Sequence, residues 1–210
     1  MDPGLLLRSS SPTRYYANLT KGSLKPTETK IVAELFNQGL SPTAVIERLV
    51  DSNDLQKRSP ASSLTLGSYL LKRLDSCPAS VVTGIVEGNS REMTQFAFVA
   101  ACAESRLLRD FLLHQVGPIR KSGRRFLTNS DWADYISWAE GQDENVAGWT
   151  EGVLKKLRQN VWRILHEVGI VDSTKTLHLQ TLRLEESVRI CLQDESLYEV
   201  AMAIASGGGQ

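Results

Sequence analysis

The chain has 210 residues, 41% of them hydrophobic and 23% charged, which is enough to fill one sizeable hydrophobic core or two small ones. Its 24 basic and 24 acidic residues cancel, which excludes a histone-like basic protein and an acidic disordered chain, so a charged partner must meet a local patch. The three cysteines lie far apart in sequence, which argues against a secreted disulfide scaffold. No apolar run approaches the ~20 residues that cross a bilayer, so we expect a folded cytoplasmic protein without a membrane segment.

Residues 14–77 predict an N-terminal tri-helical domain that is helix-turn-helix-like. The first helix ends near Gly39, because glycine adopts the left-handed conformation that closes helices. A second helix is expected to begin at Ser41. The serine side chain can cap the start of this helix, and the following proline suits its first position, because an N–H group there would have no partner within the helix. A third amphipathic helix is expected over residues 62–74.

Residues 78–119 are interpreted as connecting helices that form a structural spine. A short helix over residues 80–87 leads into a long apolar helix, which is expected to end at Gly117 because Pro118 follows it. Because this long helix is apolar, we expect it to be the most buried element of the chain.

Residues 120–195 predict a C-terminal winged-helix-like domain. Its longest helix covers residues 149–168, with apolar residues confined to one side. Apolar and polar residues alternate over residues 176–184 with one interruption, which predicts a short strand pair or a bulged strand. A last helix is expected over residues 185–192.

Both ends of the chain are expected to lie outside the fold. Residues 1–13 are rich in proline, serine and glycine and predict a disordered N-terminus, and residues 196–210 end in Gly-Gly-Gly-Gln and predict a tail. The fold class is therefore mainly α: a helical bundle with helix-turn-helix and winged-helix-like modules and a short β-hairpin near the C-terminus.

The chain lacks the sequence signatures of an enzyme. A nucleophile needs a base, and the three histidines, His114, His166 and His178, belong to no recognisable catalytic motif. No spacing of cysteine, histidine and acidic residues is typical of a metal site, and no glycine-rich loop is present to hold phosphates. We expect no catalytic residue, cofactor, metal or small-molecule substrate.

Three groups of residues instead suggest contact with DNA. Hydroxyl, aromatic and cationic side chains suit phosphates and base edges, and arginine and glutamine can bind guanine and adenine through two hydrogen bonds. On the third helix the candidates are Thr65, Ser68, Tyr69, Lys72 and Arg73. A basic loop adds Arg120, Lys121, Arg124 and Arg125. The long helix and the expected wing add Lys155, Gln159, Arg163 and Lys175.

A plainer interpretation stays open for each group. A run of cations on one side of a helix is often only a solvated surface, and tri-helical bundles also serve as protein adapters. Trp162 lies at the centre of the polar side of the long helix, where it either packs on the preceding helices or contacts a partner.

Several short motifs together resemble one protein family. They are Tyr16-Ala-Asn-Leu-Thr-Lys-Gly-Ser-Leu24, the segment from Glu28 to Gly39, Gly88-Asn-Ser-Arg-Glu92, Lys155-Lys-Leu-Arg158 and Glu167-Val-Gly-Ile170. In order and spacing they are similar to the A protein family of bacteriophage exclusion (BREX) defence systems, over most of residues 15–192.

The resemblance implies a small, mainly helical, non-enzymatic accessory protein that binds double-stranded DNA in phage defence. It also implies an N-terminal part like the antitermination factor NusB, and neighbours that include a methyltransferase and an ATPase. The alternatives are a protein-interaction adapter within the defence complex and a helix-turn-helix transcriptional regulator.

Overall fold

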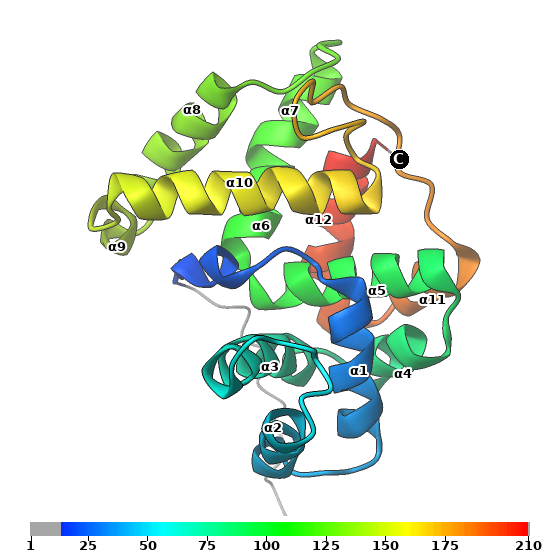
Figure 1. Cartoon of the computed structure of the whole chain (residues 1–210). Coiled ribbons are helices and arrows are strands. Elements are labelled where there is room, and N and C mark those ends of the chain that lie inside the picture. The colour runs from blue at the N-terminus through cyan, green and yellow to red at the C-terminus, as the bar shows by residue number, and fades with distance from the viewer. Residues whose placement is uncertain (1–13, 210) are drawn as a thin grey trace, which may run out of the picture.

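The computed structural model describes residues 14–209, and the N-terminus expected to be disordered lies outside them. The regular structure of this range is helical (Figure 1), so the expectation of a mainly α fold is confirmed. The α-helices are α1 (Pro26–Asn37), α2 (Pro42–Asp51), α3 (Pro60–Asp75), α4 (Ala79–Glu87), α5 (Ser90–Glu104), α6 (Arg106–Phe111), α7 (Gly117–Lys121), α8 (Asn129–Glu140), α9 (Glu144–Ala147), α10 (Glu151–Val168), α11 (Glu186–Cys191) and α12 (Tyr198–Gly208). The shorter elements are the 3₁₀ helices η1 (Ala17–Lys21) and η3 (Glu195–Leu197) and the π-helical turn η2 (Leu112–Val116).

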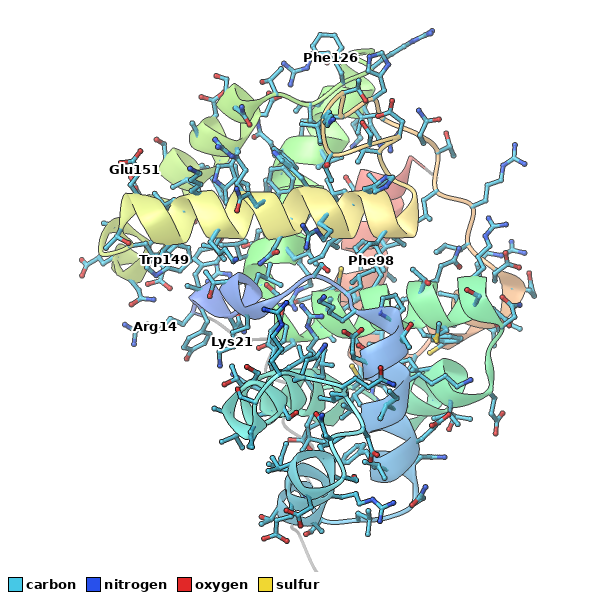
Figure 2. The ribbon with its side chains drawn as sticks, in the orientation of Figure 1. Arg14, Lys21, Phe98, Phe126, Trp149 and Glu151 are labelled. Carbon is cyan, nitrogen blue, oxygen red and sulfur yellow. The ribbon has the colours of Figure 1, made fainter. Side chains whose placement is uncertain are left out.

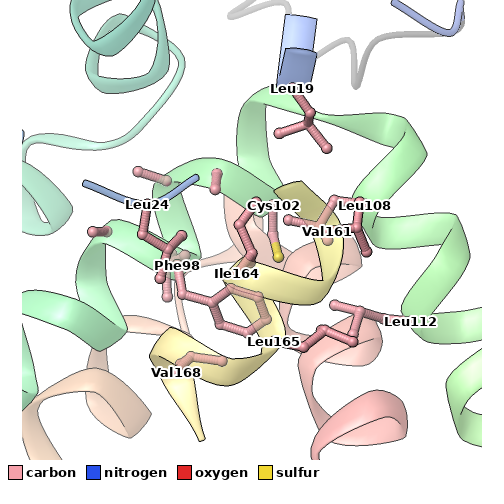
Figure 3. Close-up of a cluster of buried hydrophobic side chains, with 14 of the residues drawn as sticks. Leu19, Leu24, Phe98, Cys102, Leu108, Leu112, Val161, Ile164, Leu165 and Val168 are labelled. Atoms are coloured by element: carbon pink, nitrogen blue, oxygen red, sulfur yellow. The ribbon is translucent and has the colours of Figure 1, made fainter. Parts of the chain in front are cut away.

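Helices α5 and α10 carry the centre of the hydrophobic core. In Figure 1, α1 to α4 gather at one end of the molecule, α10 crosses its front, and α6 and α12 lie side by side behind α10. Figure 3 shows Phe98 and Cys102 of α5 beside Val161, Ile164 and Leu165 of α10, and all five side chains are fully buried. Burial of these faces, rather than intrinsic helix propensity, supplies most of the stability of such helices.

The N-terminal helices begin and end largely where the sequence indicates. Gly39 has a φ of +78° at the end of α1, and the Ser41 hydroxyl accepts a hydrogen bond from the Ala44 N–H group at 3.2 Å at the start of α2. Helix α3 begins two residues earlier than expected, at Pro60, because Ser59 caps it. The three predicted helices are therefore confirmed, whereas the division of the chain at residues 77 and 119 stays a prediction.

The central spine is not the single helix that the sequence suggests. Helix α5 ends at Glu104, and Ser105 takes an extended conformation and caps α6 through its hydroxyl group. The buried Arg109 guanidinium donates to the carbonyl groups of Cys102 and Ala103 and so satisfies the end of α5 inside the core.

The expected stop at Gly117 is also wrong. The helix continues through η2 into α7, with Pro118 in the first turn of α7. The wide π turn accommodates Pro118, which cannot donate the backbone hydrogen bond of a regular helix.

The β-hairpin expected over residues 176–184 is absent, because residues 14–209 contain no strand. This segment makes two isolated bridges, between His178 and Phe126 and between Leu179 and Val171, so its two sides face different partners. A wing needs a paired hairpin, and the winged-helix-like interpretation of residues 120–195 is therefore not supported.

The tail expected over residues 196–210 is instead mostly helix, formed by η3 and α12. Val200, Ala203 and Ile204 are buried, and α12 packs against η2, α6 and α7. Gly207 lies so close to η2 that a Cβ atom there would come within 2.5 Å of Leu112 Cδ2. The terminal glycines look like a linker in sequence, but they allow this close approach of two backbones.

Candidate nucleic-acid interface

Two of the five candidates on α3 are buried. Tyr69 is 3% exposed and Arg73 is 1% exposed, and both point toward the segment before α1 rather than toward solvent. The Tyr69 hydroxyl donates to the Gly22 carbonyl at 2.9 Å, and Arg73 Nη1 donates to the Ser23 carbonyl at 2.8 Å. Burial raises the pKa of Tyr69 to about 12. Neither side chain can reach DNA in this structure.

The other three candidates on α3 are exposed but form a weak basic surface. Thr65 donates its hydroxyl to the Ala61 carbonyl, and Lys72 lies 3.6 Å from the Glu104 carboxylate. Ser68 and Lys72 line a groove between α2 and α3 that also contains two acidic residues, Glu47 and Asp75. The acidic residues of this groove offset the charge of its one lysine.

The segment expected to be a basic loop begins inside α7, because Arg120 and Lys121 form the last turn of that helix, and only Arg124 and Arg125 lie in the loop after it. Its four cations separate into two structural arginines and two exposed cations. Arg120 donates to the carbonyl groups of Gly207, Ile170 and Gln180, and burial lowers the pKa of its guanidinium. Arg124 pairs with Asp131.

Lys121 and Arg125 of this segment are exposed. Neither forms an ion pair with the part of the chain that the structure describes.

The strongest basic surface lies on α10. This helix is capped by Thr150, whose hydroxyl accepts from the Val153 N–H group, and it ends at Gly169, which has a φ of +86°. Its solvent side, which we call the α10 basic face, consists of Lys155, Lys156, Gln159 and Arg163. The three cations of this face have no ion-pair partner among residues 14–209.

The two acidic residues of α10 form no ion pair with this face. Glu151 lies in the first turn, four residues before Lys155, and lines the same pocket as Lys155. Glu167 is turned toward the segment before α1, where it accepts hydrogen bonds from the Ser23 hydroxyl at 2.8 Å and the Leu24 N–H group at 2.9 Å. Lys155 and Arg163 are eight residues apart, about 12 Å along the helix axis, so the face offers separate cationic contacts along its length.

Trp162 packs inside the molecule, although its place on the helical wheel is polar. It is 5% exposed, and its ring centroid lies 5.5 Å from that of Phe111 and 6.1 Å from that of Trp132. Helices α6 and α8 cover this part of α10, so the packing interpretation of Trp162 is confirmed. Its indole nitrogen has no hydrogen-bond partner in the described structure.

The turn that follows α10 brings further cations to the loop after α7. The Leu127 N–H group donates to the Leu177 carbonyl at 3.0 Å, and the Leu179 N–H group donates to the Arg125 carbonyl at 2.8 Å. Lys175 is exposed in this turn. We call Lys121, Arg125 and Lys175 the basic edge, since they lie on these two joined segments.

The two segments that carry the basic edge also carry an exposed aromatic pair, which was not among the sequence candidates. Phe126 is 44% exposed, and Figure 2 shows it at the outer end of the molecule, far from α1 to α3. Its ring centroid lies 6.1 Å from that of His178, with 30° between the ring planes. The sequence offers no signal for this pair, because Phe126 and His178 are far apart in the chain and meet only through the bridge between their segments.

Neither a group of metal-ligating side chains nor a membrane-spanning helix is found among the described residues. Residues 14–209 contain no cluster of three histidine, cysteine, aspartate or glutamate side chains that could hold a metal ion. None of the helices in this range combines the length and apolarity that a bilayer crossing requires.

The fold and these surfaces define a mainly helical protein with a basic helix face and no metal cluster in its described part. The chain belongs to the BrxA family, because the profile of that family matches residues 13–196. This confirms the resemblance to the A protein family of BREX phage-defence systems.

Two curated relatives carry the name BREX protein BrxA. One from Paramagnetospirillum magneticum is 30% identical over 183 residues, 87% of this chain and 92% of the relative. One from Escherichia coli O9:H4 is 27% identical over 179 residues, 85% of this chain and 84% of the relative. A crystal structure of an uncharacterized protein from Magnetospirillum magneticum superposes with a TM-score of 0.82 and 30% identity, covering 91% of this chain and 98% of that one.

Proposed function

We propose that this protein is a non-enzymatic accessory component of a BREX phage-defence system that binds double-stranded DNA. The α10 basic face and the basic edge form the contact surface. The observation that carries the proposal is the set of exposed cations on α10 that form no ion pair with the described residues, in a chain whose net charge is zero.

The geometry of α10 suits a duplex backbone. Lysine and arginine side chains neutralise phosphates and release bound counterions, which provides most of the affinity of sequence-tolerant DNA binding. Gln159 and Arg163 lie one turn apart and are side chains that can read base edges in the major groove. Figure 1 shows no helix in front of α10, so a long ligand can lie along it.

Surface charges on α10 and on the α2–α3 loop provide a matched test of this interface. The double variant Lys155→Glu/Arg163→Glu should weaken duplex binding at least about tenfold, since each lost phosphate contact costs on the order of 1 kcal/mol. The control Arg58→Glu changes an exposed cation between α2 and α3 and should leave affinity within about twofold. Fluorescence anisotropy with a labelled duplex measures both, and equal loss in the two variants would contradict a local interface.

A protein-interaction adapter is the second candidate, and exposed apolar side chains on α11 and α12 favour it. Ile190 of α11 and Tyr198 and Met202 of α12 are large apolar side chains that remain exposed. Such side chains often anchor protein partners. The partners would be other BREX proteins, such as the methyltransferase or the ATPase. Co-purification with such a partner after nuclease treatment, lost in Tyr198→Ala/Met202→Ala, would favour this function.

A further inference from the structure

Phe126 is exposed without a reason in the stability of the fold. Its segment is extended, so neighbouring side chains point to opposite sides. Leu127 points inward and is 2% exposed, whereas Phe126 points outward and is 44% exposed. Leu127 therefore fills the core beneath this segment, and a polar residue at position 126 could adopt the same extended backbone conformation.

The aromatic ring is nevertheless held in a defined place. The backbone hydrogen bonds of Leu127 and Leu179 fix both segments, and the carboxylate of Asp172 accepts from the His178 N–H group at 2.9 Å and from the Thr176 hydroxyl at 2.8 Å. Although some desolvation of the exposed carboxylate opposes it, the hydrogen bonds from Thr176, His178 and Ser173 hold the pKa of Asp172 below its usual range. Asp172 thus supports the turn as a carboxylate, and the aromatic pair is preorganised before any ligand arrives.

The two segments that carry the pair also carry exposed cations. Arg125 immediately precedes Phe126, Lys121 ends α7 five residues before Phe126, and Lys175 lies in the turn that carries His178. An exposed aromatic ring among cations that are free of ion pairs is the arrangement by which proteins hold a nucleobase by stacking and its phosphates by charge. An apolar protein partner would gain nothing from the surrounding charges.

We propose that Phe126 and His178 form a stacking site for a nucleobase that has left the duplex stack. This inference rests on the proposed DNA-binding function and adds a preference within it: the protein favours duplexes with a locally unpaired base. The cations of the basic edge hold the flanking phosphates, while the α10 basic face contacts the paired region.

The test compares two duplexes of equal length, one fully paired and one carrying 2-aminopurine opposite an abasic position. The fluorescence of 2-aminopurine depends on how the base is stacked, so its transfer from the duplex stack to a protein side chain changes the emission. A stacked base is worth roughly a five- to 150-fold gain in affinity. We expect the wild type to prefer the second duplex at least about fivefold and to change its fluorescence.

Three variants separate stacking from folding. Phe126→Ala should lose both the preference and the change in fluorescence and keep its affinity for the paired duplex within about twofold. Phe126→Trp should retain the preference and the change in fluorescence. Tyr198→Ala removes an exposed aromatic ring outside the basic edge and should behave as the wild type. Unchanged thermal melting of Phe126→Ala confirms that the fold is intact.

The possible failures are distinguishable. Equal wild-type affinity for the two duplexes, or a preference that survives in Phe126→Ala, would overturn the stacking site and leave the α10 interface standing. Failure of the wild type to bind either duplex at low salt would overturn both proposals.

Discussion

Three buried or half-buried arginines of this chain hold backbone carbonyl groups at helix ends and in irregular segments. Arg73 binds the carbonyl of Ser23, Arg109 binds those of Cys102 and Ala103, and Arg120 binds those of three separate segments. A guanidinium group has five donors in a fixed plane, so it can satisfy several carbonyl groups that no helix or strand pairs. These arginines stabilise the fold, and their charge is not available to a ligand.

Arg120 provides a test of this structural role. Arg120→Ala leaves the carbonyl groups of Gly207 and Gln180 without this donor, so we expect a loss of about 1–3 kcal/mol in the free energy of unfolding. Lys121→Ala, at the next position, removes an exposed cation and should change stability by less than about 0.5 kcal/mol. Urea unfolding followed by circular dichroism measures both, and equal stability of the two variants would show that Arg120 acts only as a surface charge.

The ionisation of Asp131 makes the stability of the folded protein depend on pH. Burial opposes its ionisation, but hydrogen bonds from Arg124 and from the side chain and backbone of Thr128 outweigh this and hold the pKa of the carboxyl below its usual range. A carboxyl group whose pKa is lower in the folded than in the unfolded chain stabilises the fold at pH values above its pKa in the unfolded chain. This stabilisation is lost as the pH falls through its pKa in the folded chain.

We therefore expect Asp131→Asn to be less stable than the wild type by about 1–3 kcal/mol near neutral pH. The difference should stay constant down to about pH 5 and shrink below about pH 4, where the wild-type carboxyl itself becomes protonated. Thermal melting between pH 3 and pH 7 measures it, with Asp134→Asn on the exposed side of α8 as the control. A stability difference that does not change with pH would rule out the ionised Asp131 as its cause.

Helix α12 illustrates how an element depends on glycine for its packing. A Cβ atom at Gly207 would meet three atoms of the Leu112 side chain, including its Cβ at 3.0 Å, so η2 would have to shift. The same helix supplies the Gly208 carbonyl that accepts from the Leu182 N–H group at 2.9 Å. Displacement of α12 would therefore also loosen the segment that leads to α11.

We expect Gly207→Ala to destabilise the protein by about 1–3 kcal/mol, because overpacking outweighs the better helix propensity of alanine. Gly152→Ala makes the same chemical change in the first turn of α10, where the nearest atom to a new Cβ is 3.9 Å away. That variant should be neutral or more stable by up to about 1 kcal/mol. Differential scanning calorimetry of both variants checks the opposite signs, and a stabilised Gly207→Ala would contradict the close packing of α12 on η2.

The whole molecule has no net charge, so its proposed DNA binding must depend on local cations. Three to six phosphate contacts correspond to micromolar affinity and a slope of roughly −3 to −5 in a plot of log K against log salt concentration. Lys155→Glu/Arg163→Glu should make this slope shallower by about two, and Arg58→Glu should leave it unchanged.

A salt titration against duplex DNA, with single-stranded DNA and duplex RNA as competitors, measures these slopes. Binding that does not weaken between low and moderate salt would contradict an interface made of phosphate contacts. In that case, the exposed residues of α11 and α12 would become the better guide to function.

Local sequence patterns are sufficient to predict much of this molecule. The cap at Ser41 and the glycines at the ends of α1 and α10 act within one helical turn, so they can be recognised without knowledge of the fold. The apolar side of α10, the family and the exposed cations at positions 155 and 163 follow in the same way from spacing and order.

Only the tertiary structure decides which polar residues are available. Tyr69, Arg73 and Trp162 lie on polar sides of their helices, but neighbouring segments cover them, and a helical wheel contains no information about such neighbours. The break at Ser105, the missing hairpin and the helical terminal glycines likewise depend on contacts between residues distant in the chain. The pairing of Phe126 with His178 is of the same kind, since it exists only where the loop after α7 meets the turn after α10.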